Sequence, residues 1–479
     1  MNDKYEIVIG LEVHAELKTK TKIYCSCENK FGGEVNTQCC PVCMGMPGAL
    51  PVLNEKVVEY AVMMGHAVHC TINENLKQDR KNYIYPDLPK AYQISQFDIP
   101  LCENGYVEYM MGDEIKRVGI TRIHIEEDAG KLLHMEGFDS TLVDMNRCGV
   151  PLIEIVSEPD MRSAKEAKEY LETIKTILQY IDVSDCKMQE GSIRCDVNVS
   201  VMPKGSDTFG TRCEMKNINT FSGAMRAIEY EAARQIKILE NGGIIEQETR
   251  KWDDEKGENV LLRSKEDAQD YRYFKEPDIM PTTLDHDWVV ALKDRIPELP
   301  NQKINRYVQE MRIGKDDAEI IAKDFAKAQL FESIVSARDI KPRDAANWIL
   351  GDITKHCNDH QIAADKFPIS AKGVADLIAL VEDGTVSGSA AKKVFAAMLE
   401  KEADPMEYVK SMGLLQISDN SALEQMVADV LAQNPGTVND YKNGKTNVLG
   451  FLVGQCMKAS KGQGNPKILS ELLLKELQK

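Results

Sequence analysis

The chain has 479 residues, which is too long for one hydrophobic core, so about three domains are expected. The formal net charge of −17 argues against a general nucleic-acid coat, because phosphate binding depends on clustered lysine and arginine, so any RNA contact must be local. No apolar run is long enough to span a membrane and the N-terminal residues do not form a secretory signal, which indicates a cytoplasmic protein with reduced cysteines.

The first predicted element is a strand over residues 5–17. Apolar residues alternate along it, and this alternation leaves Glu12, His14 and Glu16 together on the other face. One apolar and one polar face is typical of an antiparallel sheet that is packed on one side only.

A cluster of cysteines follows this strand, with five of the 13 cysteines between residues 24 and 43. Cys25 and Cys27 form a C-x-C pair, and Cys40 and Cys43 form a C-x-x-C pair after a loop with two glycines. This spacing predicts a zinc knuckle at 25–43, and a zinc with four protein ligands is structural. Buried apolar thiols are the alternative. The spacing leaves open whether Cys39 takes the place of Cys40 in a distorted site.

The stretch KNYIYPDLPKAYQISQ begins at Lys81 and is punctuated by two prolines. The residues alone favour a loop whose tyrosines, Tyr83, Tyr85 and Tyr92, pack as core.

A second strand is predicted within RVGITRIHIEEDAGK, where Arg122, His124 and Glu126 share the polar face. Glu127 and Asp128 lie just past its expected end. A helix is predicted after it, because Ser163 and Glu166 have capping-box spacing and apolar residues recur at helical intervals as far as residue 181. This helix should cover the packed face of the sheet.

Two further strands are predicted in GSIRCDVNVSV and TRCEMKNIN. Their polar faces carry Arg194, Asp196, Asn198 and Ser200 in the first, and Arg212, Glu214 and Lys216 in the second. Taken singly, each polar face is typical of a solvated sheet surface. Taken together, carboxylates beside histidine suit a hard divalent cation such as Mg²⁺, and arginine and lysine among them suit phosphate oxygens, so the four faces indicate phosphoryl transfer.

The second half of the chain is predicted to be helical. Prolines at 277, 281, 297 and 300 mark a boundary, residues 301–404 show helical periodicity, and a third segment begins near Asp404. The only near match to a P-loop, NGKT at 443–446, has Asn439 where glycine is required, so any ATP must bind on the sheet. Residues 441–479 carry seven lysines and two glutamates, a net charge of 7 − 2 = +5, and a solvated helix end is the simplest interpretation.

Several stretches resemble the GatB family, the B subunits of the aspartyl/glutamyl-tRNA amidotransferases. They are VIGLEVHAEL, the C-x-C and CPVC pair, KNYIYPDLPKAYQISQ, HIEEDAGK, VDMNRCGVPLIEIVSEPD, GSIRCDVNVSV, EMKNINTF, VEDGTVSGSAAKKVF and GFLVGQCMKASKGQGNP. The resemblance runs the length of the chain. It implies an α+β architecture, with a mainly antiparallel-sheet cradle domain and covering helices over 1–292, an all-α helical domain over 293–404 and a small all-α tail domain over 405–479.

The resemblance also implies a reaction. ATP with Mg²⁺ phosphorylates the side-chain carboxylate of Glu on tRNA(Gln) or Asp on tRNA(Asn), and ammonia from the amidase, which is the A subunit of the complex, displaces the phosphate. A small C subunit is the third member of the heterotrimer. Which tRNA is served is not decided by the sequence.

Site residues follow from the motifs by resemblance. The implied metal set is Glu12, His14 and Glu126 or Glu127, with Asp196 and Glu214 as nearby ligands or supports of the same catalytic centre. Arg194 and Arg212 are implied to contact phosphate, and Lys81, Tyr83 and Tyr85 to line the site or the ammonia path. In the tail, tRNA binding is implied for Lys442, Lys445, Lys458 and Lys461.

Two departures from the family matter. FKEPD stands at 274–278 where members often have FPEPD. Other members lack the cysteines, so a zinc site would take no part in the reaction. A non-catalytic, zinc-stabilised tRNA-binding scaffold of the same complex is the alternative function, and a metal-dependent phosphate-ester hydrolase is a weaker one.

Overall fold

The computed structural model describes the chain apart from residues 1–3, 113, 136, 138, 265–269, 402, 417–419, 443–444, 461–462 and 478–479. It divides into two compact units, Met1–Gln302 and Lys303–Lys479. In the parts of the chain described, no helix is long and apolar enough to cross a lipid bilayer.

A nine-stranded sheet dominates the first unit, in the order β14-β13-β12-β11-β1-β10-β7-β6-β2. Neighbouring strands pair antiparallel, except that β12 and β13 are parallel. The strands are β1 (Tyr5–Glu16), β2 (Thr71–Ile72), β6 (Cys102–Met111), β7 (Glu114–Glu127), β10 (Pro151–Ser157), β11 (Ile193–Pro203), β12 (Cys213–Ile218), β13 (Glu248–Asp253) and β14 (Glu258–Ser264). Four of them, β1, β7, β11 and β12, are the strands predicted from alternation.

Smaller sheets complete the unit. Their strands are β3 (Asn75–Leu76), β4 (Asp79–Asn82), β5 (Tyr92–Ser95), β8 (Lys131–His134), β9 (Thr141–Asp144), β15 (Phe274–Lys275) and β16 (Thr282–Thr283). Short 3₁₀ turns lie at η1 (Met145–Arg147) and η2 (Met188–Glu190). The FKEPD stretch adds β15 to β4, and the buried Glu276 that follows β15 pairs with Arg80 of β4 at 2.7 Å.

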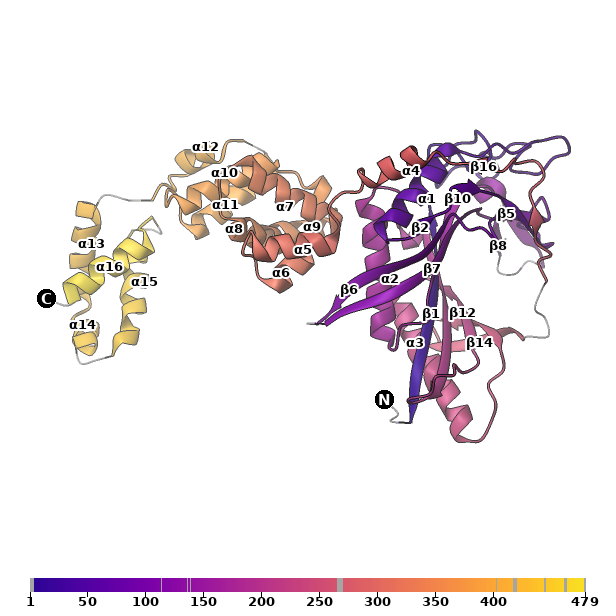
Figure 1. The fold of residues 1–479 in the computed structure, drawn as a ribbon. Helices are drawn as coiled ribbons and strands as arrows, with labels where there is room; N and C mark the ends of the chain where they lie inside the picture. Colours follow the sequence, from indigo (N-terminus) through magenta and orange to yellow (C-terminus); the bar gives the residue numbers. More distant parts are fainter. Residues whose placement is uncertain are drawn as a thin grey trace. The chain divides into compact units, whose positions relative to one another are not determined.

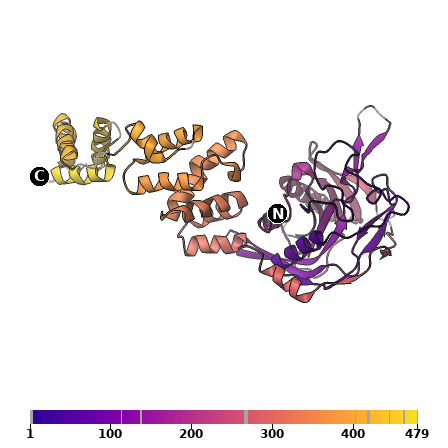
Figure 2. The same cartoon turned by 90° about the horizontal axis from the view of Figure 1, so that it is seen from above.

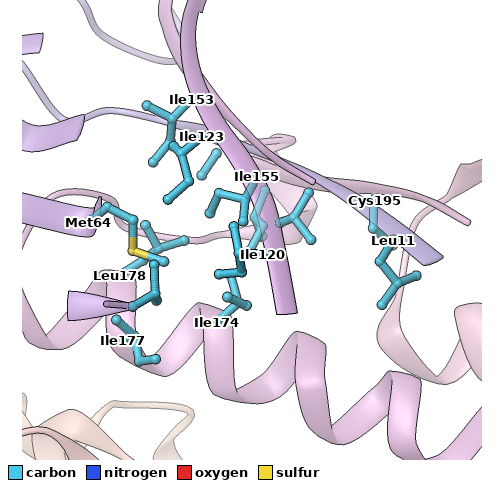
Figure 3. Close-up of a cluster of buried hydrophobic side chains, with 14 of the residues drawn as sticks. Leu11, Met64, Ile120, Ile123, Ile153, Ile155, Ile174, Ile177, Leu178 and Cys195 are labelled. Carbon is cyan, nitrogen blue, oxygen red and sulfur yellow. The ribbon is translucent and has the colours of Figure 1, made fainter. Parts of the chain in front are cut away.

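Helices cover the apolar face of the large sheet. They are α1 (Glu55–Ala67), α2 (Ala164–Tyr180) and α3 (Phe221–Glu240), with α4 (His286–Lys293) packed on α1; α2 and α3 are seen beside the sheet in Figures 1 and 2. Figure 3 shows Ile174, Ile177 and Leu178 of α2 beside apolar side chains of the sheet strands. Because most apolar side chains of β1, β7 and β11 point to this core, most of their polar side chains share the opposite face.

The predicted start of α2 is confirmed in detail. The Ser163 hydroxyl accepts a hydrogen bond from the Glu166 backbone N–H at 3.2 Å. The Glu166 carboxylate accepts from the N–H of Arg162 at 2.6 Å, one residue before the cap itself. Together the two bonds satisfy backbone donors at the helix start.

The second unit is helical. Its helices are α5 (Pro300–Gln309, which spans the division between the units), α6 (Lys315–Ala322), α7 (Phe325–Ala337), α8 (Pro342–Trp348), α9 (Thr354–His360), α10 (Ala371–Glu382), α11 (Gly388–Glu400), α12 (Pro405–Ser411), α13 (Asn420–Gln433), α14 (Pro435–Lys442), α15 (Leu449–Ala459) and α16 (Pro466–Leu477). A π-helical turn, η4 (Ile349–Ile353), and two 3₁₀ turns, η5 (Ala364–Lys366) and η6 (Thr446–Val448), interrupt them. The α+β fold class is confirmed.

The tail has its own apolar cluster, formed by Leu423, Val427, Val430, Leu452, Cys456, Leu469, Leu473 and Leu477. A separate core supports a distinct tail domain, but α12 packs on α10 and α11, and the predicted domain boundary at residues 404 and 405 stays a prediction. The first compact unit extends past the predicted end at residue 292 into α5.

Candidate catalytic cavity and metal sites

A cavity of about 450 Å³ lies over the polar face of the large sheet. Five adjacent strands supply its floor, β7, β10, β1, β11 and β12. Their side chains in the lining are Arg122, His124, Glu154, Glu12, His14, Asp196, Asn198, Glu214 and Lys216, and Arg212 joins them from the residue before β12. The four polar faces predicted separately therefore form one surface.

Strand register brings these side chains together. Glu12 lies opposite Asp196 on β11, and His14 lies opposite Glu154 on β10. Glu154 in turn lies opposite His124 on β7. Side chains of directly paired residues share one face and have Cβ atoms about 5 Å apart, so the register alone forms a row of ionisable groups across the sheet.

The first candidate cation site is His14, Glu126 and Glu154, whose ligand atoms lie within 4.8 Å of one another. The Glu154 carboxylate is 3.6 Å from His14 Nε2 and 3.6 Å from His124 Nε2. Burial alone would raise the pKa of Glu126, but the hydrogen bond from His124 and the positive charge of Lys81 lower it to about 2. Glu126 is therefore a carboxylate at neutral pH, as a metal ligand must be.

The second candidate cation site is Glu12, Asp196 and Glu214, again with ligand atoms within 4.8 Å of one another. Burial, and then repulsion from Glu154, Asp196 and Glu214, raises the pKa of Glu12. Lys216 forms ion pairs with both Asp196 and Glu214, the latter at 2.9 Å. Three carboxylates with one lysine leave an excess of negative charge, so the donor set fits a hard divalent cation.

Cationic side chains surround the two triads. Lys81, Arg122, Arg212 and Arg263 all line the cavity, and Arg212 is exposed to solvent. The negative charges of Glu126 and Glu154 outweigh burial and raise the pKa of Lys81, which keeps its ammonium charged. Carboxylates on the sheet can hold a metal cation that bridges to a phosphate group, and the surrounding lysine and arginine side chains can bind the phosphate oxygens.

Aromatic rings form one wall of the cavity. Tyr273 stacks on Phe97 with ring centroids 4.2 Å apart, and Tyr271 meets Tyr273 edge-on at 6.2 Å. The Lys81 ammonium lies 5.0 Å from the centre of the Tyr271 ring. Phe97 is 57% exposed although it is a large apolar residue, so one side of this stack is free to contact a ligand.

Glu127 and Glu126 point to opposite faces of β7. Glu127 is buried, forms an ion pair with Lys90 and accepts a hydrogen bond from the N–H of Ile94 at 2.8 Å. The geometry therefore brings Glu126, and not Glu127, beside His14. β7 runs through Glu127, so alternation of side chains along the strand decides between the two residues.

Three other predicted residues lie apart from the cavity lining. Arg194 donates to Asp128 at 2.6 Å, so its charge is already paired. Tyr83 meets the lining residue Tyr271 edge-on, at 5.9 Å between ring centroids, and Tyr85 is 54% exposed to solvent. The prediction that Tyr83 and Tyr85 pack as core residues is therefore wrong. Tyr92 is partly buried, and its ring lies under the guanidinium of Arg80.

Sequence reasoning missed Glu154, Tyr271 and Tyr273. Glu154 is in PLIEIVS, which is apolar on both sides and lacks the alternation used to find the other strands. The signal was present, because a single carboxylate in a buried central strand requires a charged or metal partner. The tyrosines follow a segment with no strand pattern, and only the tertiary fold brings them to the cavity.

The cysteine site is formed as predicted. The Sγ atoms of Cys25, Cys27, Cys40 and Cys43 lie within 4.8 Å of one another. The Cys39 thiol lies outside this set and donates to the Asn36 carbonyl at 3.3 Å, so the local geometry favours Cys40 as the third ligand.

Electrostatics favour a thiolate at Cys43, whereas the hydrogen bond to Cys43 and burial raise the pKa of Cys25, and burial raises the pKa of Cys27 to about 11. The hydrogen bond from Cys25, the backbone N–H of Cys40 and the charge of Lys22 lower the pKa of Cys43 to about 5, against the effect of burial. Four sulfur donors at these distances fit a tetrahedral zinc ion.

Three of the four tail lysines are described. Lys442 ends α14, Lys445 precedes η6 and Lys458 is in the last turn of α15, and all three are exposed. Lys445 forms an ion pair with Asp440 at 3.1 Å. Lys461 lies outside the described residues.

Comparisons with known proteins agree with this geometry. Residues 7–290 match the model of the GatB/GatE catalytic domain, and residues 329–477 match that of the GatB domain. The chain is 55% identical over 480 residues to the B subunit of the aspartyl/glutamyl-tRNA(Asn/Gln) amidotransferase of Caldicellulosiruptor bescii, covering 99% of this chain and 100% of that protein. The protein of the same name from Thermoanaerobacter pseudethanolicus is 52% identical over 476 residues, with 99% and 100% covered. The polar sheet face described above lies within the matched catalytic domain, and the chain belongs to the GatB family of tRNA-dependent amidotransferase subunits.

Proposed function

We propose that this chain binds tRNA misacylated with Glu or Asp and uses ATP to phosphorylate the side-chain carboxylate, so that ammonia from a partner amidase converts it to the amide. The observation that carries the proposal is the pair of triads on one sheet face. β1 supplies Glu12 to one triad and His14 to the other, and two residues along a strand span about 7 Å. That spacing allows both triads to contact one polyphosphate and its acceptor.

The chemistry needs two displacements. A carboxylate oxygen of the aminoacyl side chain attacks the γ-phosphorus, and the bond to the bridging oxygen breaks to release ADP. Ammonia then attacks the carbonyl carbon of the acyl phosphate, phosphate leaves and one proton is lost, giving the amide. Activation is required because a carboxylate has no adequate leaving group, whereas an acyl phosphate has one.

The main obstacle is repulsion, since ATP and the carboxylate are both anions. A divalent cation such as Mg²⁺ held by His14, Glu126 and Glu154, or by Glu12, Asp196 and Glu214, would neutralise this charge. Lys81 and Arg212 line the same cavity and can bind phosphate oxygens directly. Lys216 holds Asp196 and Glu214 in place through its ion pairs.

The aromatic wall suits a nucleobase. The exposed Phe97 ring, supported from behind by Tyr273, offers a flat apolar surface next to Lys81 and the cation sites. Bases stack on such surfaces with little dependence on their identity. We therefore include base stacking on Phe97 in the proposed binding mode.

The proposal extends to partners. Two further proteins, the amidase (the A subunit) and the small C subunit, would form a heterotrimer with this chain, as the family resemblance implies. Lys442, Lys445 and Lys458, with Lys461, would contact the tRNA backbone, because exposed lysines in a chain of net charge −17 provide a local site for phosphate.

The test uses the assembled complex with Glu154→Gln, which keeps the shape of the side chain and removes its charge. We expect tRNA-dependent ATP cleavage to fall by more than about 100-fold, since charge stabilisation by a bound cation contributes several kcal/mol. The partner's glutamine hydrolysis, measured uncoupled, should persist. Glu108→Gln, an exposed position on β6, is the matched control.

Other outcomes point elsewhere. Full ATP turnover in Glu12→Ala would leave the scaffold function as the better account. Cleavage of a phosphate ester by the isolated chain without tRNA would instead favour the hydrolase.

A further inference from the structure

A buried lysine lies beside the cysteine site. Lys22 is 1% exposed, and its ammonium donates to the carbonyls of Gln38 and Cys148, each at 2.7 Å. Its Nζ is also 3.9 Å from the Sγ of Cys43. Lysine is almost never fully buried without a partner of opposite charge, so the charge of Lys22 requires an explanation.

No carboxylate supplies that charge. Among the ion pairs found between described residues, none involves Lys22, and its two oxygen partners are neutral carbonyls. The group in contact with its ammonium that can become anionic is the Cys43 thiol, which belongs to the cysteine cluster. Four thiolates around one divalent cation carry a net charge of −4 + 2 = −2, which a buried ammonium would halve.

We propose that Lys22 is a positioning residue of the cysteine metal site, where its ammonium compensates the excess charge of the four thiolates and holds the Cys40–Cys43 knuckle against the turn at Cys148. This inference concerns metal binding and does not depend on the proposed reaction.

The same lysine joins the metal site to the catalytic sheet. Cys148 precedes Gly149, whose φ of +78° favours glycine and whose carbonyl accepts from the N–H of Ile23 at 3.0 Å. Gly149 also donates to the Asp128 carbonyl at 3.0 Å, and β10, which carries Glu154, begins two residues later. A loaded cysteine site therefore supports the start of the strand that contributes to the first cation triad.

The experiment measures zinc affinity of the full chain by competition with a chromophoric chelator. For Lys22→Met we expect zinc to bind about 10- to 100-fold more weakly, the usual effect of removing a group that supports metal ligands. Lys30→Met, an exposed position in the same loop, should bind like the unchanged protein. Lys22→Gln, which can still donate hydrogen bonds but has no charge, should lose affinity as well, whereas Lys22→Arg should lose less.

A second measurement, the Tm with and without zinc, separates charge compensation by Lys22 from a role in packing alone. In metal-free protein Lys22 faces fewer thiolates than the four that surround a bound ion, so Lys22→Met should cost less stability there and narrow the difference in Tm between zinc-loaded and zinc-free protein. The visible spectrum of the cobalt-substituted site should also shift, because the hydrogen-bonded thiolate of Cys43 changes. Equal loss of Tm in both forms, or zinc affinity within about twofold of the unchanged protein for Met and Gln alike, would overturn the proposal.

Discussion

The cysteine site and the carboxylate triads are both candidate metal sites, but they are assembled in different ways. The four cysteines lie within residues 25–43, and two short turns bring them together. The triads draw on five strands, β1, β7, β10, β11 and β12. Of the pairs of these strands that are neighbours in the sheet, only β11 and β12 also follow each other in the sequence. A closed set of local sulfur ligands is suited to stability, whereas carboxylates on several strands leave room for a substrate between them.

The sharpest test of the sheet site compares two adjacent residues on opposite faces of β7. Glu126→Gln should reduce tRNA-dependent ATP cleavage by more than about 100-fold, because it removes a charged ligand from the first triad. Glu127→Gln should instead lower stability, by about 3–5 kcal/mol, because it leaves Lys90 buried without its counter-charge. Steady-state ATP cleavage and thermal unfolding of the two variants are the measurements. Equal effects of both changes on ATP cleavage, with equal loss of Tm, would show that Glu126 acts through folding.

Removal of the metal ligands tests the cysteine site. The purified chain should contain about one zinc, and the double change Cys40→Ser with Cys43→Ser should abolish it, since half of the ligands are lost. Elemental analysis gives the stoichiometry, and Cys39→Ser should retain the metal because its thiol lies outside the cluster. Fully active protein that contains no zinc would contradict a structural role for the ion.

The tail tests whether substrate binding extends beyond the cavity. Deleting residues after 405 should raise the KM for charged tRNA steeply and leave glutamine hydrolysis by the partner intact. In the full-length chain, replacing Lys442, Lys445 and Lys458 together with alanine should reduce the slope of log affinity against log salt by about 2 to 3, because each phosphate contact releases about one counterion. Unchanged KM and salt slope would leave the tail as a solvated helical end.

The smallest expected effect concerns the aromatic wall. Phe97→Ala removes the exposed face of the stack, and stacking on one base contributes about 1–3 kcal/mol, so KM for ATP or for charged tRNA should rise about fivefold or more with little change in kcat. Initial rates with each substrate varied in turn identify which base is involved. Phe97→Tyr serves as the control, and a fall in kcat at unchanged KM would count against stacking.

Local pattern was sufficient for most elements of the fold. Alternation identified β1, β7, β11 and β12, the capping residues located the start of α2, and cysteine spacing identified the four thiols that cluster. Each of these features depends on residues close together in the chain, where the period of a strand or helix or the reach of a turn limits the possibilities.

Only the tertiary structure decided how the polar faces combine. Strand order places β10 between β1 and β7. This order adds Glu154 and places the residues of the predicted single metal set in two candidate cation sites. It also directs Arg194 toward Asp128, and brings Tyr271 and Tyr273 from a distant segment to the cavity. The physical reason is that sequence period determines the face on which a side chain lies, whereas pairing between distant strands determines its neighbours, and that pairing depends on packing over the whole sheet.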